Sequence, residues 1–270
     1  MLGIMGNSAL FAQLAGRGGR KMPVIKFTSS TDDPYIQALS CNGTITIEST
    51  KDGQPVVENY KDLDLITVNI QADADTEVKI SGYVTDLYFT AYDEDAEDYS
   101  GFTDLSSLDL SGTNVLKAMS VDYNSGLEEL DVTHNTNLQT LICGDIENLT
   151  GIDVSKNTKL TYLYCAYCEG ITELNLAANT ALQTLNCGGT SITELNLAAN
   201  TALQTLYCNS CTSLDDIYYP GTQQQPARSI ASAITAATAA DGTVYTDSAG
   251  AYYSTIETAA TAKGWTIEQL

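Results

Sequence analysis

The sequence predicts a β-rich solenoid of the α+β class, a rod of short parallel strands with a cap at each end. Two periodic phrases support this prediction, because self-similarity at a fixed short period is the signature of stacked repeats. The first phrase, L-x-x-L-x-L-x-x-N, recurs at intervals of 22, 22, 22, 21 and 22 residues, and its first apolar position falls at Leu105, Leu127, Leu149, Ile171, Ile192 and Leu214. The second phrase, L-x-x-L-x-C, lies half a period away and starts at Leu116, Leu138, Leu160, Leu182 and Leu203.

Each phrase is expected to form one side of a coil. In the central L-x-L of the first phrase both leucines point inward, so these segments should stack as parallel strands about 4.8 Å apart. The second phrase also carries an apolar-x-apolar pair, which leaves no room for a full helix and predicts a weakly curved rod. The ninth position of the first phrase should turn inward and bond backbone groups, since an unpaired buried group costs about 1–3 kcal/mol. This position holds Thr113, Asn135, Asn157, Asn179, Asn200 and Thr222.

Composition divides the chain into four regions. Alternating β-branched stretches with Asn42-Gly43 and Asp52-Gly53 turns predict a small β cap before the repeats. Val84-x-x-Leu87-x-Phe89 lies 21 residues before Leu105, and we interpret it as an irregular first coil in the register of the first phrase. After the repeats, helices are expected at 227–240 and 252–263, with a short strand at 243–246. The regions are 1–22 (leader or attachment segment), 23–83 (β-rich N-terminal cap), 84–222 (leucine-rich repeat solenoid) and 223–270 (C-terminal α/β cap).

The charge balance excludes several classes of function. With 34 acidic and 12 basic residues the net charge is −22, so the chain should repel nucleic acid and anionic membranes. No apolar run reaches the roughly 18 residues of a membrane span. Gly6-Asn7-Ser8 interrupts the N-terminal apolar stretch and the basic residues follow it, so we expect no conventional signal peptide.

The seven cysteines admit three interpretations. Cys165-x-x-Cys168 and Cys208-x-x-Cys211 mimic a zinc site, but coils two apart are separated by about 10 Å, whereas sulfurs on one zinc lie under about 4 Å apart. The odd total disfavours a complete set of disulfides. We favour a structural role, in which cysteine acts as a small apolar residue, at the inward position of the second phrase: Cys143, Cys165, Cys187 and Cys208.

Few residues suggest chemistry. Asp93, Asp95 and Asp98 belong to a dense acidic loop that is a weak calcium candidate, although a solvated acidic turn is the simpler interpretation. The single histidine, His134, has no nucleophile–base partner in the repeat pattern. We therefore expect no enzyme and no cofactor.

Candidate binding residues lie at the exposed positions of the repeats, because solenoids present such columns on a rigid backbone. Two columns follow the first phrase: Asp109, Asp131, Asp153, Asn175, Asn196 and Tyr218, with Glu129, Gly151, Glu173, Glu194 and Asp216 beside them. The second phrase exposes Tyr162, Tyr164, Tyr167 and Tyr207, a residue type favoured at interfaces. A merely soluble exterior explains both sets equally well.

The repeats resemble the cysteine-containing leucine-rich repeats of bacterial surface proteins, similar to one group of internalins. The resemblance rests on NTALQTLNC at 179–187 and ITELNLAAN at 192–200, and extends over about 84–221. It implies a leucine-rich-repeat rod that binds or adheres outside the cell without catalysis. The absence of a recognisable signal peptide departs from that pattern.

The sequence thus predicts a non-catalytic binding module for a protein or glycan ligand, including a cationic one, that is extracellular or on a bacterial cell surface. The alternative is a structural or receptor-binding component of a phage tail or similar assembly, attached through the N-terminal segment.

Overall fold

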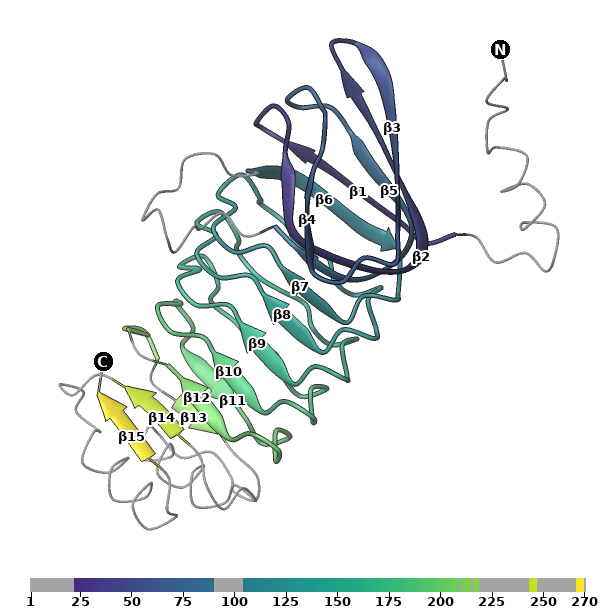
Figure 1. The fold of residues 1–270 in the computed structure, drawn as a ribbon. Helices are drawn as coiled ribbons and strands as arrows, with labels where there is room; N and C mark the ends of the chain where they lie inside the picture. Colours follow the sequence, from purple (N-terminus) through teal and green to yellow (C-terminus); the bar gives the residue numbers. More distant parts are fainter. Residues whose placement is uncertain are drawn as a thin grey trace, which may run out of the picture.

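The computed structural model describes residues 22–89, 104–208, 210–214, 216–218, 243–246 and 266–269. All regular elements in these ranges are β-strands, and Figure 1 shows them as an N-terminal sheet followed by a stack of coils. A leucine-rich-repeat-like rod of parallel strands is therefore confirmed. The acidic loop with Asp93, Asp95 and Asp98, and most of the segment 1–22, lie outside the described residues.

The N-terminal sheet is antiparallel and built from long strands. β2 (Tyr35–Lys51) pairs with β3 (Gln54–Lys61), β4 (Ile66–Asn69) and β5 (Val78–Tyr88). β1 (Val24–Ser29) lies between β5 and β6 (Leu105–Gly112). Burial alternates along β1, as expected for a sheet with one apolar face.

The sheet and the solenoid share strand β5. Its last three residues pair in parallel with β7 (Ala118–Ser120), which begins the stack of coils. The ring of Phe27 meets that of Phe89 edge to face, with centroids 4.8 Å apart, so the cap core continues into the first coil. The boundary expected between residues 83 and 84 falls within β5.

A continuous parallel sheet runs through the second phrase. β7 is followed by β8 (Thr140–Ile142), β9 (Tyr162–Tyr164), β10 (Thr184–Asn186) and β12 (Thr205–Tyr207). The strands pair in register, so that the inward leucines stack directly on one another. These leucines are Leu141, Leu163, Leu185 and Leu206.

The expectation of a parallel sheet through the first phrase was largely wrong. That phrase forms strands only at β6, at β11 (Glu194–Asn196) and at β13 (Asp216–Tyr218) among the described residues. In the coils between β6 and β11 the first phrase forms no strand, and its Asp and Asn side chains accept backbone N–H groups within each coil. Its inward positions are nevertheless in the core: Leu130 and Leu174 are buried, and Leu108 and Ile152 pack against the core.

The register expected for Val84 was also wrong. Leu87 pairs with Met119, so the segment belongs to the second phrase and Val84 corresponds to Leu116. A match to apolar spacing could not distinguish the two phrases, because both begin L-x-x-L. The preceding cap strands decide the register by fixing the direction in which β5 enters the stack.

Buried asparagines connect the coils along one edge. The amide of Asn157 donates to the carbonyl oxygens of Val132 and Asn135 in the preceding coil, both at 2.9 Å. Each of these asparagines also joins two tight turns through its own backbone. The predicted inward amides are confirmed at four positions, which we call the asparagine ladder: Asn135, Asn157, Asn179 and Asn200.

Two further strands extend the parallel sheet. β14 (Thr243–Thr246) pairs with β12, and β15 (Thr266–Gln269) pairs with β14. The strand expected at 243–246 is present. The helices expected at 227–240 and 252–263 lie outside the described residues, so the α/β character of the C-terminal cap is not supported by the part of the chain that is described.

Candidate functional site

The predicted acidic column is exposed, but its side chains fold back on their own backbone. Asp153 accepts a hydrogen bond from the backbone N–H of Ser155 at 2.9 Å, and Asp131 accepts one from Thr133 at 2.8 Å. The same Asx turn occurs throughout the column, which we call the turn face: Asp109, Asp131, Asp153, Asn175 and Asn196. Each side chain therefore satisfies a backbone N–H two residues further along the chain, in the strand-forming coils as well as in the others.

Hydrogen bonding also stabilises the charged form of these aspartates. The side-chain hydroxyl and then the backbone N–H of Ser155 lower the pKa of Asp153, and Thr133 does the same for the pKa of Asp131. The neighbouring glutamates of the column, Glu129, Glu173 and Glu194, are exposed. For Tyr218 the structure gives the backbone in β13 but no side-chain environment.

The predicted tyrosines lie on the opposite side, over the parallel sheet. Tyr162 and Tyr164 flank the inward Leu163 on β9, so both rings project outward and each is half-buried. Pairing places Tyr162 beside hydroxyl side chains and Tyr164 beside polar and apolar ones. The outward residues form two columns that we call the sheet face: Thr140, Tyr162, Thr184 and Thr205, and Ile142, Tyr164, Asn186 and Tyr207.

The corner that follows each sheet strand uses a left-handed backbone conformation. It recurs at Tyr123, Asp145, Tyr167, Gly189 and Ser210, with φ of 61°, 54°, 58°, 68° and 58°. Glycine adopts this conformation without strain, whereas a bulky residue seldom does. Two of the five positions nevertheless hold tyrosine, and Tyr167 is 48% exposed. Sequence spacing did not reveal this feature, because the occupants share no chemistry.

Glycines make room for the tyrosine rings. A Cβ at Gly189 would lie 2.6 Å from Cδ1 of Tyr167, and one at Gly144 would overlap the ring of Tyr164. The Tyr164 hydroxyl reaches toward Oδ2 of Asp145, 3.4 Å away. Burial and the nearby Asp122 raise the pKa of Asp145, and burial followed by the Asp145 charge raises that of Tyr164. The rings therefore lie on a fixed, partly desolvated platform.

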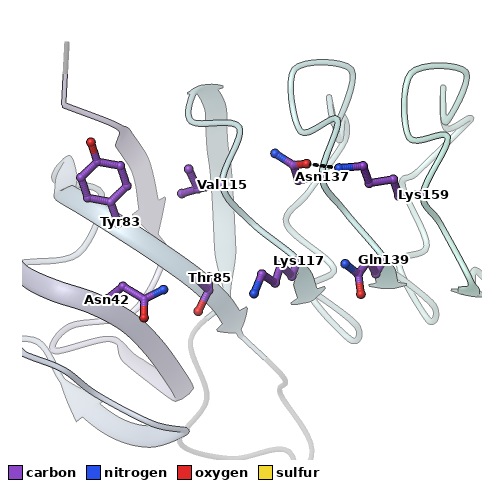
Figure 2. Close-up of a pocket in the computed structure, with 8 residues that line it drawn as sticks. All are labelled: Asn42, Tyr83, Thr85, Val115, Lys117, Asn137, Gln139 and Lys159. Carbon is purple, nitrogen blue, oxygen red and sulfur yellow. Dashed lines mark hydrogen bonds between the residues drawn. The ribbon is translucent and has the colours of Figure 1, made fainter. Parts of the chain in front are cut away.

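A polar pocket lies where the N-terminal sheet meets the first coils. Its volume is about 450 Å³, and Figure 2 shows side chains from the cap and from three successive coils around it. Lys117 and Gln139 occupy equivalent positions directly before β7 and β8. The lining residues are Asn42, Tyr83, Thr85, Val115, Lys117, Asn137, Gln139 and Lys159. None of them was singled out from the sequence, because the two parts of the chain meet only in the folded state.

The expected core position of the cysteines is confirmed. Cys143, Cys165, Cys187 and Cys208 are buried in the stack, and burial raises the pKa of Cys143 and Cys165. All seven cysteines are unbridged thiols. Within the described ranges there is no group of three or more His, Cys, Asp or Glu side chains placed to hold a metal ion.

Comparisons with solved structures find a similarity to an internalin domain, whereas comparisons with family models and curated proteins find none. No protein-family model matches the sequence, and no curated protein matches it. The functional domain of InlJ from Listeria monocytogenes, described as including a cysteine ladder, is 29% identical over 43% of this chain, with a TM-score of 0.36. The match spans only 27% of that structure's chain. At this TM-score the superposition adds nothing to the fold, which rests on the hydrogen-bonded coils themselves. Among the described residues, no helix is long and apolar enough to cross a membrane.

Proposed function

We propose that this protein is a non-catalytic binding module of a bacterial cell surface or its surroundings, which recognises a glycan or protein ligand with the sheet face and the adjoining corner at Tyr167. The observation that carries the proposal is the row of outward tyrosines, two of them on one strand and one held at a strained corner. A non-glycine residue in a left-handed conformation costs of order 1 kcal/mol. At Tyr167 this conformational cost is offset when the exposed ring contacts a bound ligand.

The chemistry of the sheet face favours a glycan over a protein. Tyrosine rings present flat apolar surfaces with a polar end, suited to sugar rings as well as to protein contacts. Thr140, Thr184 and Thr205 share a column with Tyr162 and offer hydroxyl groups to a ligand rich in hydroxyls. Strand pairing fixes the spacing of these side chains, so that little entropy is lost on binding.

The test compares the two sides of the rod on an array of defined glycans. A double variant, Tyr162→Ala with Tyr167→Ala, should lose at least about tenfold in affinity for any glycan that the wild type binds. A matched variant of the opposite side, Glu129→Ala with Glu173→Ala, should bind within about twofold of the wild type. Equal losses in both variants, or unchanged binding in the tyrosine variant, would contradict the proposal. Circular dichroism and thermal melting would establish that both variants are folded.

A further inference from the structure

The lysines of this acidic chain fall into two groups. In the N-terminal sheet, every described lysine contacts a carboxylate: Lys26 with Glu77, Lys51 with Asp33, Lys61 with Asp62 and Lys79 with Glu48. In the described part of the solenoid, Lys117, Lys156 and Lys159 form no ion pair. Two of these three, Lys117 and Lys159, line the polar pocket between the N-terminal sheet and the first coils, which we call the junction pocket.

Lys159 is held in position by neighbouring coils. Its Nζ donates to Oδ1 of Asn137 at 2.6 Å (Figure 2). Nδ2 of Asn137 donates in turn to the carbonyl of Asn114 at 2.7 Å. The bond to Asn137 uses one of the three N–H donors of the ammonium group, so two donors remain. The pocket therefore presents an oriented cation that lacks an anionic partner.

The backbone of Lys117 is also held by hydrogen bonds to neighbouring segments. Its N–H donates to the carbonyl of Thr85 at 2.7 Å, and its carbonyl accepts from the N–H groups of Gln139 and Thr140. The Lys117 and Lys159 positions are two coils apart, which corresponds to about 10 Å along the stack. This separation suits a ligand that carries more than one negative group better than a single small ion.

The rest of the lining suits an oligosaccharide. Asn42 and Gln139 offer amide groups, Tyr83 is 39% exposed and offers a ring face, and Val115 is an aliphatic residue of the lining. Among the described residues, no carboxylate lines the pocket. The nearest acid on the same strand, Asp86, already accepts a hydrogen bond from Thr85 at 2.7 Å. The pairing of β2 with β5 is irregular between Asn42 and Thr46, so the Asn42 side of the pocket lies at a break in the ladder.

We infer that the junction pocket binds an acidic oligosaccharide of the uronic-acid type. Its carboxylates pair with the ammonium groups of Lys117 and Lys159, its hydroxyls bond Asn42 and Gln139, and one sugar ring lies along Tyr83. The inference does not depend on ligand binding at the sheet face, since none of these side chains belongs to that surface. An acidic peptide offers carboxylates too, and a comparison with hexaglutamate distinguishes it from an acidic oligosaccharide.

Calorimetric titration of the full chain with tetragalacturonate tests the inference. The wild type should bind tetragalacturonate, bind more weakly as salt is raised, and bind neither neutral galactotetraose nor hexaglutamate comparably. Lys117→Gln with Lys159→Gln should lower the affinity by at least about tenfold, because two charge-assisted contacts are lost. The charge-conserving Lys117→Arg with Lys159→Arg should retain binding within about fivefold.

Lys156 provides the matched control. It is an exposed lysine in the same coil as Lys159, but it does not line the pocket. Lys156→Gln should therefore change the affinity by less than about twofold. The inference fails if tetragalacturonate does not bind, if Lys156→Gln weakens binding as much as the pocket variant, or if hexaglutamate binds as tightly. The Tyr162→Ala, Tyr167→Ala variant should bind tetragalacturonate normally, so failure here and failure of the proposed function are distinguishable.

Discussion

The two long sides of the solenoid satisfy their backbones in different ways. On the sheet face, neighbouring strands pair with each other, for example Leu141 with Leu163. On the turn face, exposed Asp and Asn side chains accept backbone N–H groups, and the asparagine ladder donates to backbone carbonyls. Outward side chains are thus structural on the turn face, whereas on the sheet face the backbone needs few of them. Asn186, which accepts from the N–H of Gly188, is an exception.

This difference indicates which side of the solenoid is better suited to a binding role. Replacing Asp131 or Asp153 with a residue that has no side-chain acceptor removes a turn as well as a charge, so few residue types are tolerated on the turn face. Changing Tyr162 leaves strand pairing intact. The binding role predicted for the acidic column stays a prediction, and the comparison of faces favours the tyrosines.

The largest expected effect is on the asparagine ladder. Asn157→Ala removes the two buried hydrogen bonds to the carbonyls of Val132 and Asn135, although each carbonyl keeps a backbone N–H donor, and should lower the free energy of unfolding by about 2 kcal/mol. The buried Oδ1 of Asn157 has no hydrogen-bond partner, so its removal offsets part of the loss. Urea denaturation measures the change. Asn148→Ala is the control, since its bond to the Ser125 carbonyl is exposed and should be worth less than about 1 kcal/mol.

A second prediction contrasts two glycines on the two sides. A Cβ at Gly144 would overlap the Tyr164 ring and lie 2.8 Å from the carbonyl of Ala166, so Gly144→Ala should destabilise by about 1–3 kcal/mol. At Gly151, in the first phrase, a Cβ meets nothing within 4 Å. Gly151→Ala should change the unfolding free energy by no more than about 0.5 kcal/mol. Thermal melting of the two variants would refute this packing contrast if the shifts were equal.

A third prediction concerns Asp145, at the corner beyond the sheet. Because its pKa is raised in the folded state, folding is disfavoured as the pH rises above the ordinary value of 3.8 and the carboxyl ionises. Asp145→Asn removes that penalty while keeping an acceptor for Tyr164. The variant should be more stable than the wild type at pH 7, by less than about 1 kcal/mol, and should lose this advantage below pH 4. A uniform advantage at every pH would exclude ionisation as the cause.

The smallest expected effect concerns Asp131 and Asp153, whose contribution to stability decreases as the pH is lowered, unlike that of Asp145. The pKa values of Asp131 and Asp153 are lowered in the folded state, so their contribution is complete above the ordinary value of 3.8 and is lost as the pH falls through the folded values. Replacing both Asp131 and Asp153 with Asn keeps the side-chain acceptors of the turns but removes the titrating carboxyl groups. The double variant should lose less stability than the wild type between neutral and acid pH, by about 0.5 kcal/mol after solvent screening. Urea denaturation at pH 7 and pH 3 would show an identical loss if the turns do not depend on charge.

The sequence by itself determined the period, the inward leucines and cysteines, and the asparagine ladder. These follow from spacing alone, because each residue repeats the environment of its counterpart about 22 residues away. Spacing also identified the exposed columns, including Tyr162 and Tyr164.

Only the tertiary structure decided which phrase forms the sheet, where Val84 belongs and where the pocket lies. Both phrases have the same apolar pattern, so this pattern could not show which of them pairs continuously from coil to coil. The pocket joins Asn42 and Tyr83 to lysines from two coils, which are distant in sequence and adjacent only after the cap has docked. Residue spacing cannot predict such contacts, because the cap does not contain the repeat.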